Sequence, residues 1–279
     1  MLADGLSVTL RALSFIALFQ AAGIALFRVF FSGELTTTRA TLRRIGTRSA
    51  VVAAILVVGH YALEAARMSG DLAGVMDPAL QSLVLHSSTS AALGMRLSGL
   101  LLIAISFRIT GLIGALLALA AFTLVGHTTD YSYRWLLSVL LFFHLFVVAF
   151  WFGALAPLLV VSSREPHVVT GRIVRRFSSL AVWLVPGLLV AGVVLAALLL
   201  PDLAALGTPY GRLLLVKIFG FAALLGLGAL NKWRLGPAIA RNGARASRAF
   251  RRSLVAEYAL MVGVLSVTAV LTTFYSPVE

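Results

Sequence analysis

The chain of 279 residues contains no cysteine. This absence excludes disulfides, thiolate metal sites, cysteine nucleophiles and the Cys-x-x-Cys-His attachment of a c-type haem. A metal bound by this protein must therefore be held by histidine, methionine, carboxylate or backbone groups.

Charge is also scarce, because only 12% of the residues are charged and 60% are hydrophobic. A soluble domain carries about 25% charged residues, so we expect a membrane protein without a separate soluble domain. The net charge of +13 does not indicate a nucleic-acid partner, since the arginines lie in particular loops between apolar segments. The start of the chain, Met1 to Gly5, lacks the basic region of a cleaved signal peptide, so the first apolar segment is predicted to be retained.

Long apolar segments fill most of the chain. A helix that crosses a bilayer needs ~20 apolar residues, and eight segments approach or exceed this length. The predicted fold is an all-α, polytopic membrane bundle of eight transmembrane helices. It forms one integral membrane domain with four-helix halves at residues 1–130 and 131–279, and Arg108 marks the turn between the third and fourth segments. The predicted spans are Leu6–Phe31, Ser49–Ala66, Leu85–Phe107, Thr110–Gly126, Tyr133–Val161, Phe177–Leu200, Tyr210–Asn231 and Leu254–Phe274.

Basic residues gather on one side of these spans. Positively charged loops stay in the cytoplasm, whereas the opposite loops carry four aspartates and few basic residues. Eight spans with both termini outside, in the periplasm, satisfy every loop and predict a multi-pass protein of the bacterial inner membrane. The basic loops contain Arg39, Arg43, Arg44 and Arg48, then Arg164, Arg172, Arg175 and Arg176, and finally Lys232 with six arginines from Arg234 to Arg252.

Two histidines are predicted to lie deep in the bilayer, where polar side chains are costly and usually functional. At 1.5 Å of rise per residue, His60 and His144 lie about 16 Å from the ends of their spans and Met95 about 15 Å. In a hydrocarbon core of about 30 Å, these three residues share the middle layer. Imidazole with thioether suits copper, particularly Cu(I).

A second group is predicted at the outer mouth. His86 and His127 lie at the outer ends of the third and fourth spans, and Glu64 lies on the same helical face as His60. Imidazole with carboxylate suits Cu(II) or zinc. A copper ion, Cu(I) or Cu(II), would then pass from the mouth to His60 and His144. The alternative for each histidine is a structural hydrogen bond to a neighbouring helix.

Three other charged residues fall inside predicted spans. Arg96 beside Met95 costs at least ~2.5–3.5 kcal/mol there and needs a partner, for which Glu64 or a bound anion such as a haem propionate is a candidate. Lys217 is expected to reach the interface with its long side chain. Glu257 is expected to pair with an arginine at the inner boundary.

Several motifs lie in the second half, over residues 140 to 275: His144-Leu145, Phe150–Gly153, Arg175–Ala181, Gly207–Lys217 and Ala229–Leu235. In these motifs the chain resembles the CopD family of bacterial copper-resistance membrane proteins. The resemblance implies an inner-membrane protein of copper handling, often working with a periplasmic copper-binding protein of CopC type. Among the outer histidines, only His144 lies in a matched segment. Tyr210, Arg212 and Lys217 belong to the most specific motif and serve either structure or transport.

The sequence therefore favours copper transport or handling across the membrane by a protein that is not an enzyme. No nucleotide-binding Gly-x-x-x-x-Gly-Lys-[Ser/Thr] motif is present, so transport would be passive or ion-coupled. One alternative is a cytochrome with haem b between His60 and His144 or between His86 and His127. Another is a membrane scaffold for a periplasmic copper-binding protein. Import, export and sensing stay open.

Overall fold

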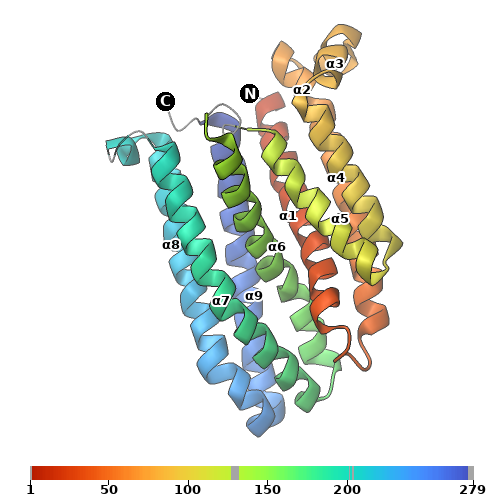
Figure 1. The fold of residues 1–279 in the computed structure, drawn as a ribbon, viewed down its shortest axis with the longest axis vertical. Helices are drawn as coiled ribbons and strands as arrows, with labels where there is room; N and C mark the ends of the chain where they lie inside the picture. The colour runs from red at the N-terminus through yellow and green to blue at the C-terminus, as the bar shows by residue number, and fades with distance from the viewer. Residues whose placement is uncertain (1, 127–131, 201, 203, 276–279) are drawn as a thin grey trace.

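The structure is a computed structural model that describes residues 2–126, 132–200, 202 and 204–275 (Figure 1). None of these residues forms a β-strand, which confirms the all-α fold. Seven helices in this part of the chain are long and apolar enough to cross a membrane. The boundary predicted between the two halves, at residues 130 and 131, lies outside the described residues.

The first half contains four long helical segments and a small cap. The fourth segment, formed by α5 and the 3-10 helix η2, is shorter than the others at residues 108–124. The short elements η1 and α3 connect α2 to α4 and lie above their ends (Figure 1). The bounds are α1 Leu2–Phe31, α2 Arg39–Ser69, η1 Leu72–Met76, α3 Pro78–Leu85, α4 Ser88–Ile105, α5 Arg108–Ala120 and η2 Ala121–Leu124.

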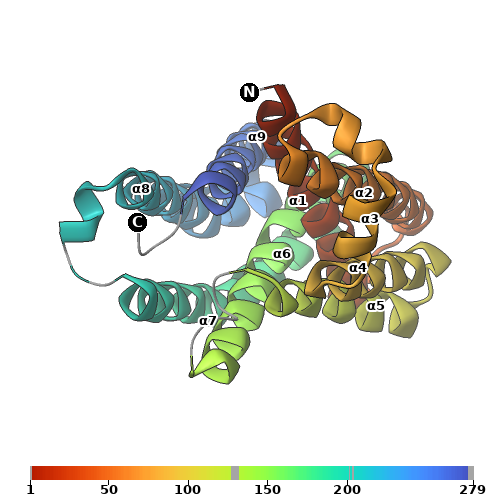
Figure 2. The same ribbon diagram turned by 90° about the horizontal axis from the view of Figure 1, so that it is seen from above.

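The second half contains α6, α7, α8 and α9. Helix α6 joins the second half to the first, with α1 on one side and α7 on the other, and α8 lies at the edge beside α9 (Figure 2). The bounds are α6 Arg134–Arg164, α7 His167–Leu199, the 3-10 helix η4 Ala204–Gly207, α8 Pro209–Leu230, the π-helix η5 Asn231–Leu235 and α9 Gly236–Phe274.

The bundle has two chemically different ends. The connections from α1 to α2 and from α6 to α7 lie at one end, together with η5, and we call this the basic end (Figure 1). The start of α1, the last turn of α9, α3 and η4 lie at the other, which we call the termini end (Figure 1). The helices therefore separate the basic residues from the aspartate-bearing connections, as the charge pattern predicted.

Several boundaries differ from the predicted ones. Arg39 to Arg48 lie within α2, and Arg172 to Arg176 lie within α7, so these basic segments are helical rather than loops. Helices continue past the apolar stretch because their backbone hydrogen bonds are internal and long arginine side chains can reach polar surroundings. Helix α4 begins at Ser88, not Leu85, because the hydroxyl of Ser87 caps it by accepting a hydrogen bond from the Thr89 amide over 3.2 Å.

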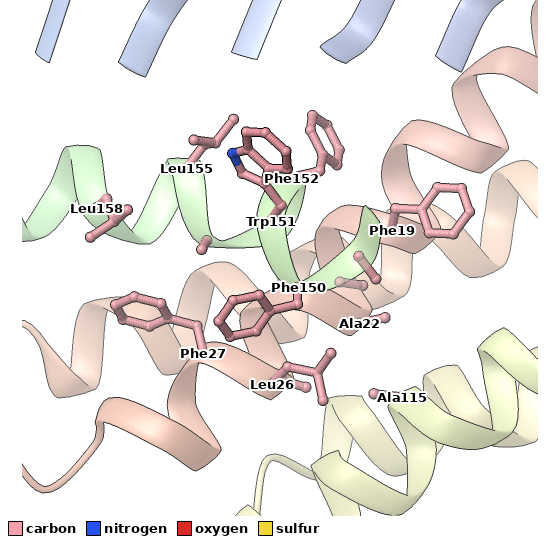
Figure 3. Packing of buried hydrophobic residues seen from close by; sticks show 14 of the residues in the cluster. Phe19, Ala22, Leu26, Phe27, Ala115, Phe150, Trp151, Phe152, Leu155 and Leu158 are labelled. Carbon is pink, nitrogen blue, oxygen red and sulfur yellow. The ribbon is translucent and has the colours of Figure 1, made fainter. Parts of the chain in front are cut away.

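The two halves meet at a close crossing of α1 and α6. A Cβ atom on Gly23 would lie 2.0 Å from the carbonyl oxygen of Ala149, and one on Gly153 would lie 2.3 Å from the Cα of Gly23. Only glycine allows backbones to approach so closely, a common device of membrane helices. Figure 3 shows the buried side chains around this contact, with Phe150 on the side of α6 that faces Phe27 and Leu26 of α1, and Trp151 on another side.

At the basic end, Glu165 joins the connection between α1 and α2 to the start of α7. Its carboxylate accepts hydrogen bonds from the backbone amides of Thr36, Thr37 and Thr38 and from the hydroxyls of Thr36 and Thr38. Burial by itself raises the pKa of Glu165, but these hydrogen bonds outweigh it and bring the pKa to about 2. The ionised carboxylate therefore holds the start of α2 in place.

Candidate functional site: a polar cluster at the termini end

His60 lies in a cluster of charged side chains that joins α1, α2 and α9. Arg11 of α1 donates from Nε to His60 Nε2 over 3.2 Å, from Nη2 to Glu64 Oε1 over 3.3 Å and from Nη1 to the Thr272 carbonyl of α9 over 2.8 Å. Arg67 Nη1 donates to Glu64 Oε2 over 3.0 Å. We call Arg11, His60, Glu64, Arg67 and Arg96 the Arg11 cluster.

Arg96 of α4 lies near these groups, but its main contact is aromatic. Its guanidinium carbon lies 4.3 Å from the centre of the Phe122 ring, which stacks on Phe19 of α1. A cation over a desolvated ring is stabilised by about 2 kcal/mol or more. The expected partner Glu64 pairs with Arg11 and Arg67 instead, and Arg96 Nε is buried without a hydrogen-bond partner.

One nitrogen of the His60 imidazole is hydrogen-bonded and the other is not. Nε2 accepts the hydrogen bond of Arg11 and lies 3.6 Å from Glu64 Oε1, whereas Nδ1 is buried without a hydrogen-bond partner. The Arg11 cluster contains three arginines and one carboxylate, so it carries an excess of positive charge. A copper ion that bound Nε2 would have to displace Arg11 first.

His144 lies in a different part of the bundle. It contacts α7 beside Gly192, where a Cβ atom would lie 3.5 Å from His144 Cε1, and beside the backbone of Leu188. Lys217 of α8 is half-buried, and its charge reaches His144. The structure thus gives His60 neighbours on α1 and gives His144 neighbours on α7 and α8. It does not place both imidazoles among the same side chains.

The predicted mouth residues are spread over separate elements. His86 is exposed at the end of α3, and its Nδ1 lies 2.7 Å from the carbonyl oxygen of Ser82 in the same helix. Met95 is half-buried on α4, next to Arg96. His127 lies outside the described residues. Within the described part of the chain, no three histidine, aspartate or glutamate side chains converge as a metal site would require.

The Gly207–Lys217 motif has a structural basis in part. Thr208 caps α8 by accepting a hydrogen bond from the Gly211 amide over 3.2 Å, and Pro209 follows at the first helical position. A Cβ atom on Gly211 would lie 2.3 Å from the Ala205 carbonyl oxygen of η4. Arg212 is exposed and Tyr210 half-buried, so the shape of the α7–α8 connection explains Gly211 but not Arg212.

A second buried polar group lies nearer the basic end. Glu257 of α9 accepts hydrogen bonds from Trp151 Nε1 over 3.2 Å and from Asn231 Nδ2. The prediction that Glu257 pairs with an arginine is wrong, because its carboxylate is bonded to neutral donors of α6 and η5 and no arginine side chain in the described part of the structure pairs with it. Trp151 and Asn231 each belong to a motif of the family resemblance, and we call the three residues the Glu257 site.

Two of the most connected polar residues were not identified from the sequence. Arg11 lies five residues into the first predicted span, and a charge at such a position is a signal in itself. Glu165 lies in a basic connection, where nothing in its neighbours along the chain indicates the five hydrogen bonds that it accepts. Its partners lie more than 120 residues away.

These features define the class: a multi-pass, all-helical membrane protein with polar groups buried inside the bundle. The sequence model named "Copper resistance protein D-like, N-terminal domain" matches residues 1–132, and the one named "Copper resistance protein D" matches residues 171–271. Together they cover most of the chain, which belongs to the CopD family of copper-resistance proteins. This confirms the resemblance of the second half and extends it to the first.

One curated relative matches part of the chain. Over 171 residues the chain is 33% identical to "Copper transport protein CutJ" of Bacillus subtilis (strain 168), a match that spans 60% of this chain and 30% of that relative. No solved structure matches the chain. The family is described as copper-resistance proteins and the relative as a copper transport protein.

Proposed function

We propose that the protein transports copper across the bacterial inner membrane. The basic end would face the cytoplasm and the termini end the periplasm, in accordance with the positive-inside rule. α5 and η2 would together form the fourth of eight crossings, since the preceding turn at Ser106 and Phe107 is held to α1 by Arg28. The Arg28 side chain donates to the Ser106 carbonyl over 2.7 Å and to its hydroxyl over 3.0 Å.

The observation that carries this proposal is the position of His60. It is the one imidazole of the described residues that lies in a cluster joining the first and the last helix of the chain, through Arg11 and Thr272. Copper would enter from the termini end, displace Arg11 from Nε2 and bind His60, with Glu64 and Met95 on neighbouring faces as further ligands. The surrounding arginines oppose tight binding of a cation, which suits transport because a transported ion must also leave its site.

His144 would form a second position for copper in the other half of the bundle. It is half-buried and lies at a helix contact where Gly192 leaves room beside the ring. Lys217 would reduce the residence time of a cation there by charge repulsion. His86, Tyr210 and Arg212 would act at the termini end, before copper reaches either imidazole, and His127 stays a candidate ligand from the sequence alone.

A periplasmic copper-binding protein of CopC type would deliver the ion to the cap formed by η1 and α3. The cap lies at the termini end and exposes large apolar side chains, among them Met76 at 84% exposure and Leu83 at 60%. Exposed apolar residues of this kind are found where another protein or the membrane surface binds.

The test is copper uptake into liposomes that contain the purified protein. We expect uptake of Cu(I), and we expect the double variant His60→Ala with His144→Ala to lose most of it. His167→Ala is the matched control, because His167 lies at the basic end beside Ser247. Uptake that is unchanged in the double variant would indicate a scaffold role, and a Soret band in the purified protein would indicate a haem protein. Either result would overturn the proposal.

A further inference from the structure

Glu257 is an acidic side chain enclosed by the second half of the bundle. It is 2% exposed, and its two hydrogen-bond partners, Trp151 and Asn231, are 5% and 8% exposed. The indole of Trp151 is held in place by Phe221 of α8, at 6.4 Å between ring centres, and by Gly228, where a Cβ atom would lie 3.5 Å from the ring. Water and lipid are therefore both kept from the carboxyl group.

No cation neutralises this carboxylate among the described residues. Helices α1, α6, α7 and α8 and the π-helix η5 pack against α9. Of these, α6 and η5 present the neutral donors of Trp151 and Asn231 to the carboxylate, and no charged group of the others forms an ion pair with it among the described residues. On α9, Arg251 donates to the Ser162 carbonyl over 3.2 Å. On η5, Lys232 lies over the Trp233 ring at 5.7 Å. An unpaired charge buried in a membrane protein is expensive and is kept where it has a function.

The hydrogen-bonding groups around Glu257 suit a proton better than a metal ion. Trp151 and Asn231 direct N–H groups at the carboxylate, at positions that a cation would need. Hard cations prefer about six oxygen ligands, and the site offers only the carboxylate and Asn231 Oδ1. That amide oxygen is buried without a hydrogen-bond partner. Once the Asn231 side-chain amide rotates, this oxygen can accept a hydrogen bond from the O–H of a protonated Glu257. Asn231 can thus form a hydrogen bond with Glu257 both as the carboxylate and as the protonated carboxyl group.

Two titratable residues lie toward the termini end on the helices that carry Trp151 and Asn231. On α6, His144 precedes Trp151 by seven residues, and on α8, Lys217 precedes Asn231 by fourteen. Both spacings place the two residues on one helical face, about 10 Å and about 21 Å apart along the axes. Asn231 also begins the π-helix η5, a local widening of the helix that often accompanies functional sites.

We propose that Glu257 binds and releases a proton, and that this proton is the coupling ion of copper transport. The step is the transfer of one proton to a Glu257 carboxylate oxygen, which gives a neutral carboxyl group that donates to Asn231 Oδ1, and its later release. The proton arrives from the termini end along the faces that carry His144 and Lys217. The coupling part of this inference rests on the proposed copper transport, whereas the proton site itself does not.

The first experiment measures protonation directly. Infrared difference spectra of the protein in liposomes are recorded over a pH titration, and the carbonyl stretch of a protonated carboxyl group is followed. We expect a titrating band that Glu257→Gln abolishes and that Glu34→Gln retains, since Glu34 pairs with Arg176 at the basic end. Trp151→Phe removes a donor that favours the carboxylate, so the midpoint of the band should move to higher pH. A band that is absent, or that responds to sodium at constant pH, would overturn the proposal.

The second experiment separates this inference from the proposed function. Copper uptake is measured with an imposed pH difference, inside alkaline, in wild type and in Glu257→Gln. We expect the pH difference to accelerate wild-type uptake several-fold and to leave the variant unaffected, while Gly226→Ala behaves as wild type. Uptake that ignores the pH difference in the wild type overturns the coupling. If uptake is absent and the infrared band is present, copper transport is wrong, and the proton site stands.

Discussion

Arg11 Nε and His60 Nε2 lie 3.2 Å apart, in a hydrogen bond that joins the first two helices of the chain. The same guanidinium reaches Thr272, near the end of the last helix. Arg11 therefore occupies the nitrogen at which we propose that copper binds, and it also ties the first helix to the last turn of α9.

Replacing Arg11 should strengthen copper binding at His60. Arg11→Leu removes a hydrogen bond to a charged group, worth about 1.5–3 kcal/mol, and removes a positive charge beside the metal. We expect Cu(I) affinity to rise about tenfold, which corresponds to about 1.4 kcal/mol, in a competition titration with a chelator. Arg44→Gln, an exposed change at the basic end, should leave the affinity unchanged. An equal affinity in Arg11→Leu and wild type would show that copper does not bind His60 Nε2.

The crossing of α1 and α6 should tolerate no side chain. Gly23→Ala would place a methyl group 2.0 Å from the Ala149 carbonyl, and the helices would have to separate at a cost of about 1–3 kcal/mol. We expect a lower midpoint of thermal unfolding in detergent. The midpoint is measured by size-exclusion chromatography of heated samples. Gly94→Ala is the control, because nothing lies within 4 Å of its added methyl group. A Gly23→Ala protein as stable as Gly94→Ala would contradict the close crossing.

Glu165 should make stability depend on acid pH. Its pKa is about 2 in the folded protein against an ordinary value of 4.5, so the unfolded chain binds a proton more readily. The contribution of Glu165 is complete above pH 4.5 and is lost as the pH falls toward 2. Glu165→Gln should lose about 1–3 kcal/mol at neutral pH and flatten this part of the profile, measured by chemical unfolding at several pH values. Parallel profiles for variant and wild type would rule out this role.

In the Tyr-Gly-Arg start of α8, Gly211 should be needed for stability and Arg212 should not. Gly211→Ala forces a methyl group to within 2.3 Å of the Ala205 carbonyl oxygen of η4, so we expect a loss of about 1–3 kcal/mol in stability. Arg212→Gln is exposed and should keep wild-type stability, as should Gly226→Ala in the same helix. If Arg212→Gln unfolds as readily as Gly211→Ala, the arginine has a packing role that the structure does not show.

The comparison of sequence and structure is most informative at Glu257. Its position in an apolar helix marked it as unusual, and the nearby arginines indicated an ion pair. The structure shows Trp151 and Asn231 as its partners, 106 and 26 residues away. Such a site depends on how α6, α8 and α9 pack around one another, and no local spacing records that. Arg96 shows the same limit, since its contact with Phe122 depends on the packing of η2 against α4.

The sequence by itself determined that the protein lies in a membrane, that its fold is helical, and that basic residues gather at one end of the bundle. Apolar length and arginine position act on each segment independently of its neighbours, so they can be read one segment at a time. The tertiary structure decided which polar groups meet. It placed Arg11 on His60, separated the neighbours of His60 from those of His144, and enclosed Glu257, because helices pack by the shapes of their side chains and by the glycines that let their backbones touch.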